Sequence, residues 1–136
     1  MLLGIDYGTK RIGLALGDME TGVVTPWRVI QTMPQKEFLA QLRQAIDEYH
    51  VTRIIVGEPR FSTSEPTAQT EITMKFVAFL RTHINLPIET EDEFFTTKEA
   101  RHVLRSAGLI KDQVDAHAAA LILQAWIDKN KQSVFN

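Results

Sequence analysis

The sequence contains no cysteine among its 136 residues. A disulfide framework and a thiolate metal site are therefore both excluded. The absence suits a reducing compartment, and we predict a cytoplasmic location. Long apolar runs are also missing, because none approaches the ~20 residues that a membrane-spanning helix needs. The apolar start of the chain has no basic region before it and meets Asp6 at once, unlike a signal peptide, so we expect no membrane partner.

An excess of basic charge is absent too. The formal net charge is -2 at pH 7. Proteins that coat nucleic acid without specificity are usually basic, so this class is disfavoured. An enzyme that holds nucleic acid through bound cations and a local basic patch remains compatible with the composition. The four histidines do not pair at the spacing of metal ligands, and His117 is expected to pack on the last helix.

The composition is that of a globular chain, with 44% apolar and 24% charged residues, and the length fits one domain over residues 1–136. Short apolar or alternating segments bounded by turn residues predict five strands, four of them at residues 2–5, 12–16, 23–30 and 54–56 and the last beginning with residues 87–90. Apolar residues at helical spacing predict helices over residues 35–49, 72–80, 97–106 and 114–129.

Three strands come first, and helices then alternate with strands. This order predicts an α/β fold with a mixed five-stranded sheet and helices on both faces. A leading hairpin followed by such an alternation is the RNase H-like pattern. The first strand should be central, which would bury Leu3 and Ile5.

Acidic residues stand at the ends of the predicted elements. Asp6 ends the first strand, Asp92 and Glu93 end the last strand, and Asp115 opens the last helix. The carboxyl ends of strands in an open α/β sheet face the functional crevice, so we expect these side chains to converge. Carboxylates without histidine or cysteine suit a hard cation such as Mg²⁺ or Mn²⁺. Two such ions about 4 Å apart would activate a water and stabilise the leaving oxygen of a phosphodiester.

Each acid also has a structural explanation. Asp6 precedes Gly8 and would shape the turn between two strands. Asp115 would offset the dipole of its helix. Glu58 ends another predicted strand, and we favour a loop role for it over a catalytic one.

The acidic run at residues 89–93 is ambiguous in another way. It would fit a solvated edge of the sheet equally well. Period-two alternation places Glu89, Glu91 and Glu93 on one strand face and Asp92 on the other. Only one face can point into a site, so Asp92 and Glu93 are rivals for the same role.

Four motifs occur in one order along the chain. They are Gly4-Ile5-Asp6-Tyr7-Gly8-Thr9-Lys10-Arg11-Ile12-Gly13, Ile55-Val56-Gly57-Glu58-Pro59, Asp92-Glu93-Phe94-Phe95-Thr96-Thr97, and Val114-Asp115 followed by Ala118-Ala119 and Ile122-Leu123-Gln124. In this combination they resemble the YqgF (RuvX) family of Holliday-junction-resolvase-like proteins. The resemblance spans residues 4–128, and four ordered motifs are far more specific than any one.

The resemblance implies an RNase H-like fold. It maps the family's proposed acids onto Asp6, Glu93 and Asp115, as catalytic residues and as ligands of Mg²⁺ or Mn²⁺. It implies a metal-dependent nuclease that acts in 5′-end processing of pre-16S rRNA or on branched DNA such as Holliday junctions. The residues do not choose between these two substrates. Glu58 replaces a family leucine, and Phe94 replaces a family arginine, which removes a phosphate donor that phenylalanine cannot supply.

Basic residues close to the acids are the predicted substrate contacts. They are Lys10, Arg11, Lys98, Arg101 and Arg105. The first two lie in the leading hairpin, and the last three share one face of a predicted helix because their spacing is i, i+3 and i+7. We expect them to contact phosphates, and an ordinary solvated surface is the alternative.

Two functions of other classes stay open. The motif that contains Asp6 also resembles the first phosphate loop of actin-like ATPases, but that fold needs two such domains and this chain has room for one. The stronger rival is a noncatalytic nucleic-acid-binding or ribosome-assembly module on a nuclease fold. Retention of Asp6, Glu93 and Asp115 argues against this module, and the loss at Phe94 argues weakly for it. A homodimer would suit a two-fold symmetric junction.

Overall fold

The computed structural model describes residues 1–8, 10–31, 34–59, 68–93, 106–108 and 111–135, with the backbone alone at residues 59, 93, 111–113 and 132–135. The elements in chain order are β1 (Leu2–Tyr7), β2 (Arg11–Gly17), β3 (Val24–Gln31), α1 (Gln35–Tyr49), β4 (Arg53–Pro59), α2 (Ala68–His83), β5 (Ile88–Glu93) and α4 (Lys111–Phe135).

The strands form one five-stranded sheet in the order β3-β2-β1-β4-β5. The pairs β1–β2 and β2–β3 are antiparallel, whereas β1–β4 and β4–β5 are parallel. Pro26 lies in the edge strand β3, the place in a sheet where proline is tolerated. Leu3 and Ile5 of the central strand are fully buried. The prediction of a mixed sheet with the first strand at its centre is therefore confirmed.

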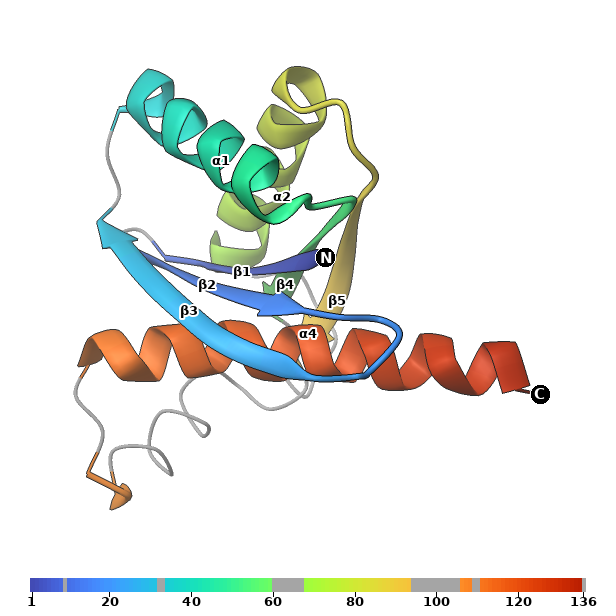
Figure 1. Ribbon diagram of the computed structural model, residues 1–136. Coiled ribbons are helices and arrows are strands. Elements are labelled where there is room, and N and C mark those ends of the chain that lie inside the picture. The colour runs from blue at the N-terminus through green and yellow to red at the C-terminus, as the bar shows by residue number, and fades with distance from the viewer. Residues whose placement is uncertain (9, 32–33, 60–67, 94–105, 109–110, 136) are drawn as a thin grey trace.

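Helices cover both faces of the sheet, as predicted. Figure 1 shows α1 and α2 on one face and the long helix α4 along the other. Alternating strand residues supply both cores, because successive side chains of a strand point to opposite faces. Leu3, Ile5 and Val56 belong to the core beneath α1 and α2, whereas Leu2 and Ile55 belong to the core beneath α4.

Glycines let α4 approach the sheet very closely. A Cβ atom at Gly4 would lie 2.9 Å from the carbonyl oxygen of Ala119. At Gly13 it would lie only 2.0 Å from the carbonyl oxygen of Asp115. The backbone of α4 therefore rests directly on β1 and β2, and any side chain at Gly13 would separate the helix from the strand.

The described elements lie where they were predicted, but most are longer than predicted, and α4 differs most. It extends to Phe135, whereas a helix ending near residue 129 was predicted. Beyond the predicted end the helix still contacts the sheet, because Lys131 Nζ lies beside Gly22 in the turn between β2 and β3. Most of the helix predicted over residues 97–106 falls outside the part of the chain that the structure describes. No helix among the described residues is long and apolar enough to cross a membrane.

Candidate functional site

Asp6 lies on the sheet face that α4 covers. Leu2 packs in the core beneath α4, and Gly4 contacts Ala119 of that helix. Period-two alternation along β1 puts Asp6 on the same face. Asp6 is only 7% exposed, and it lies within the strand rather than in the turn that follows. The site therefore begins with a carboxylate that the fold holds largely out of water.

Gly13 brings Asp115 to the same part of the sheet. Gly13 is the register partner of Asp6 in the β1–β2 pair. It also contacts the backbone of Asp115, because no side chain separates the strand from the helix. Asp115 is 3% exposed. Two acids that are far apart in the sequence thus both neighbour Gly13, one across the strand pair and one through the helix backbone, and both are buried.

Arg11 forms an ion pair with Asp115. Its Nε donates a hydrogen bond to Asp115 Oδ2 at 2.7 Å. The arginine side chain is 29% exposed, whereas that of the aspartate is 4% exposed. Arg11 was predicted to contact substrate phosphate, and the structure shows that its guanidinium also holds a predicted metal ligand in place.

The acids of β5 divide between the two faces of the sheet. Glu91 forms an ion pair with Lys129 of α4 and is buried, so its face is the one that carries Asp6. Glu89 pairs with Arg53 of β4. Asp92 follows Glu91 directly, so alternation along the strand places it on the opposite face.

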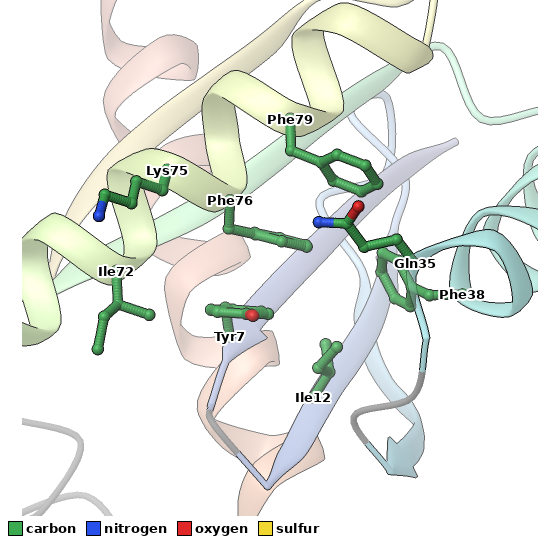
Figure 2. A pocket seen from close by; sticks show the side chains of 8 residues that line it. All are labelled: Tyr7, Ile12, Gln35, Phe38, Ile72, Lys75, Phe76 and Phe79. Atoms are coloured by element: carbon green, nitrogen blue, oxygen red, sulfur yellow. The ribbon is translucent and has the colours of Figure 1, made fainter.

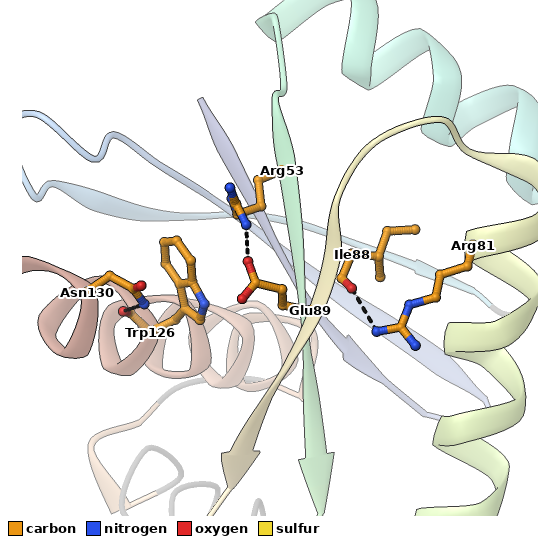
Figure 3. A network of polar contacts seen from close by, with 6 residues as sticks. All are labelled: Arg53, Arg81, Ile88, Glu89, Trp126 and Asn130. Atoms are coloured by element: carbon orange, nitrogen blue, oxygen red, sulfur yellow. Dashed lines mark hydrogen bonds and ion pairs between the residues drawn. The ribbon is translucent and has the colours of Figure 1, made fainter. Parts of the chain in front are cut away.

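Contacts on both sides fix β5 in the sheet. Figure 3 shows the ion pair between Arg53 and Glu89 on one side of the strand. On the other side Arg81 of α2 donates a hydrogen bond from Nη2 to the carbonyl oxygen of Ile88 at 2.9 Å. The guanidinium carbon of Arg53 also lies 5.5 Å from the ring centre of Trp126, which links β4 to α4. The strand that ends at Glu93 therefore has a well-defined position.

Glu58 is buried inside β4, so the expectation of a loop residue was wrong. Ile54 and Val56 of the same strand lie in the core beneath α1 and α2, and alternation gives Glu58 that face as well. Its register partner is Asp92. These two acids therefore share a face that is opposite to the face of Asp6.

The described residues contain only part of the predicted site. No group of three or more acidic or histidine side chains among them is close enough to hold a metal ion. Asp6 and Asp115 are described in full, but Glu93 is described only as the last backbone position of β5. Lys10 is exposed. Phe94, Lys98, Arg101 and Arg105 lie outside the described residues.

Arg11→Gln is expected to lower the free energy of unfolding by about 2 kcal/mol when no divalent cation is present. The reason is that the change removes a charged hydrogen-bond donor from a carboxylate that is nearly inaccessible to water. Denaturant unfolding in EDTA measures this effect. Adding Mg²⁺ should recover more stability in the variant than in the unaltered chain, since a cation near Asp115 replaces the lost positive charge.

The matched control is Glu89→Gln, which removes a charge from the Arg53–Glu89 pair. Both side chains of this pair are more than a third exposed. An exposed ion pair contributes only about 0–1 kcal/mol, so this change should have a small effect. Equal losses in the two variants would contradict a special role for the pair at Asp115.

Comparison with known families agrees with this geometry. The model of a family described as "RuvX: Holliday junction resolvase" matches residues 1–129. A protein of Rickettsia africae named "Putative pre-16S rRNA nuclease" is 37% identical over 134 residues, which cover 96% of this chain and 87% of the relative. A protein of Chloroflexus aggregans with the same name is 34% identical and covers 96% of this chain and 94% of its own.

Solved structures with this fold include resolvases. The structure described as "T. thermophilus RuvC in complex with Holliday junction substrate" has a TM-score of 0.59 at 17% identity, covering 96% of this chain and 94% of that one. A fowlpox virus resolvase bound to Holliday junction DNA has a TM-score of 0.54 at 9% identity, covering 94% and 97%. At such low identity these likenesses establish the RNase H-like fold alone. The family model and the relatives, matched over almost their whole length, show that the chain belongs to the RuvX family of Holliday junction resolvases.

Proposed function

We propose that the chain is a metal-dependent nuclease that hydrolyses phosphodiester bonds, with Asp6, Glu93 and Asp115 as its catalytic acids. The observation that carries this proposal is that Gly13 has Asp6 as its strand partner and the backbone of Asp115 as its contact in α4, with both acids buried on this side of the sheet. Carboxylates placed in this way offer the ligands that a hard cation prefers.

The donor set fits a hard cation. Asp6 and Asp115 offer carboxylate oxygens, and no sulfur ligand is possible in a chain without cysteine. Mg²⁺ and Mn²⁺ prefer such oxygen ligands. When bound, one or two of these ions would supply an activated water and neutralise the charge that develops on the leaving oxygen.

Glu93 is the third ligand in this proposal, in preference to Asp92. Its support comes from the strand alternation. Glu91 pairs with Lys129 of α4, and Glu93 is two positions further along the same strand. Residues two apart in a strand share a face, which favours Glu93 on the side of Asp6.

The other residues of the chain orient these acids and hold the substrate. Arg11 keeps the carboxylate of Asp115 in a fixed position through its Nε hydrogen bond. A guanidinium carries five donors in a planar fork, a geometry that also suits a phosphate oxygen. Lys10, Lys98, Arg101 and Arg105 are the other proposed phosphate contacts.

The names of the relatives suggest two substrates. Relatives named as pre-16S rRNA nucleases favour an RNA precursor, and the family description favours branched DNA. We propose action in the cytoplasm on one of these, with ribosomal RNA maturation preferred because the curated relatives carry that name. A homodimer would be needed only for a two-fold symmetric junction.

A cleavage assay on the purified full chain tests this function. Its substrates are a four-way DNA junction, a single-stranded RNA and an RNA that spans the 5′ end of the 16S sequence. Each is incubated with Mg²⁺, Mn²⁺ or EDTA. We expect cleavage of at least one substrate with either metal and none with EDTA.

Two outcomes would contradict the proposal. Cleavage that persists in EDTA would show that the reaction does not need a divalent cation. Binding without cleavage of any substrate, in either metal, would instead support a noncatalytic nucleic-acid-binding or ribosome-assembly module.

A further inference from the structure

A pocket lies at the end of β1, on the sheet face opposite to the face that carries Asp6. Its volume is about 260 Å³. We call it the aromatic pocket, and its main lining residues are Tyr7, Gln35, Phe38, Lys75, Phe76 and Phe79. These side chains come from β1, α1 and α2, which are brought together only by the fold (Figure 2).

Four of its eight lining residues are aromatic. Tyr7 stacks on Phe76 with 4.0 Å between ring centres and an interplanar angle of 11°. Phe38 packs against Phe76 at 5.7 Å with the rings tilted by 55°. Phe79 completes this side and is only partly buried. Phe38 and Phe76 are almost fully buried, so the flat apolar surface that the pocket presents comes mainly from Tyr7 and Phe79, which are partly exposed and rest on the buried rings.

Two polar side chains lie at its rim. In Figure 2 the carboxamide of Gln35 lies near the rings of Phe76 and Phe79, whereas the amino group of Lys75 points away from them. Gln35 offers both donors and an acceptor, and Lys75 offers a positive charge. Both residues are exposed, and none of the eight lining side chains is acidic.

This combination matches the chemistry of a nucleotide. A nucleobase has flat faces that stack with aromatic rings and polar edges that pair with an amide. Its phosphate would be attracted to Lys75. Sequence-tolerant binding of single strands commonly combines aromatic side chains with nearby positive charge in this way.

The location connects the pocket to the proposed catalytic acids. Tyr7 directly follows Asp6 in β1, so their side chains point to opposite faces of the same strand end. A single strand that crosses this end of the sheet would reach both positions with neighbouring nucleotides. A paired base would have to leave its duplex before it entered.

We propose that the aromatic pocket binds one unpaired nucleobase of the nucleic acid, next to the phosphodiester held at Asp6 and Asp115. This inference rests on the proposed function, because it assumes a nucleic-acid substrate. It adds a preference for single-stranded or locally unpaired segments beside the cleaved bond.

The test uses short oligonucleotides that contain one 2-aminopurine, whose fluorescence falls when it stacks. Single-stranded RNA, single-stranded DNA and a fully paired duplex are compared, in EDTA and again with Ca²⁺. We expect both a fluorescence decrease and binding for single strands, and clearly weaker binding for the duplex, whose affinity is measured by competition because its 2-aminopurine is already stacked. The RNA and DNA probes identify which single strand the pocket prefers.

Two variants and two controls locate the effect. Lys75→Ala and Phe79→Leu should each weaken binding of the single strand by about tenfold and reduce the fluorescence change. Met74→Ala on the same helix and Lys131→Ala on α4 should not, because neither residue lines the pocket. Lys75 is exposed, so its variant is expected to fold even if Phe79→Leu proves unstable.

The other possible outcomes test the pocket proposal separately from the nuclease proposal. If the unaltered chain binds single strands and all four variants bind equally well, the pocket proposal is wrong and the nuclease proposal stands. If the chain binds none of the three probes in either condition, the pocket proposal is wrong, and the cleavage assay decides the nuclease proposal separately. If the duplex binds as tightly as a single strand does, and Lys75→Ala and Phe79→Leu weaken both equally, the requirement for an unpaired base is wrong.

Discussion

Asp6→Asn is expected to lower the rate of metal-dependent cleavage by about a thousand-fold or more, which corresponds to about 4 kcal/mol of lost transition-state stabilisation. The change keeps the shape of the side chain but removes the charge that a cation needs. Asp6 is buried, and it neighbours Gly13 where that glycine contacts the backbone of Asp115. A carboxylate on the protein surface therefore cannot take its place as a metal ligand. Single-turnover cleavage with saturating Mg²⁺ measures the effect.

Stability must be measured in the same variant, because a turn-forming role for Asp6 predicts another result. We expect the free energy of unfolding in EDTA to change by less than about 1 kcal/mol, since the amide retains an acceptor oxygen and like-charge repulsion is relieved. Asp47→Asn, an exposed acid on α1, is the matched control and should leave both quantities unchanged. A large loss of stability with cleavage largely retained would show that Asp6 serves the fold instead.

The sheet could be predicted from the sequence because its pattern is local. Short apolar segments separated by turn residues marked all five strands, and residues 35–49 marked α1 with the observed bounds. Leu3 and Ile5 were expected in the core because a run of apolar residues on a central strand is buried on both faces.

Positions that depend on tertiary contacts were harder to predict. Glu58 is a charged residue between a glycine and a proline, which is typical of a loop. In the structure β4 continues through Glu58, because it pairs in parallel with β5. The last turns of α4 have a polar sequence, and Lys131 lies beside Gly22 only after the strands have formed the sheet. In both cases a contact distant in the sequence overrides local propensity.

The candidate site shows the same division. Asp6 and Asp115 were singled out because each ends or opens an element, but nothing local indicated that Gly13 would join them. The ion pair of Arg11 with Asp115 also links residues from opposite ends of the chain. Phe76 and Phe79 lie in a segment whose helical spacing of apolar residues predicts only a helix with a buried face. The pocket that they line forms only when the fold places Tyr7 against Phe76.

Gly13→Ala is expected to have the largest effect on stability, with a loss of about 3 kcal/mol or more. The new Cβ atom would lie 2.0 Å from the carbonyl oxygen and 2.5 Å from the carbonyl carbon of Asp115. Neither side can yield easily. β2 is hydrogen-bonded to strands on both sides, and the atoms in conflict are helix backbone. For a chain of this length the loss corresponds to a fall in melting temperature of about 10 °C.

Gly17→Ala is the matched control, because it lies in the same strand and faces the same helix. Its Cβ atom would come within 2.9 Å of Leu123 Cδ2, the end of a side chain that can rotate away. We expect a loss of about 1 kcal/mol there, with the catalytic acids undisturbed. In Gly13→Ala, by contrast, the part of α4 that carries Asp115 must move away from Asp6, so cleavage should be lost even at temperatures where the variant is still folded. Equal stability in the two variants, or full activity in folded Gly13→Ala, would show that the close approach of α4 at Gly13 does not form the site.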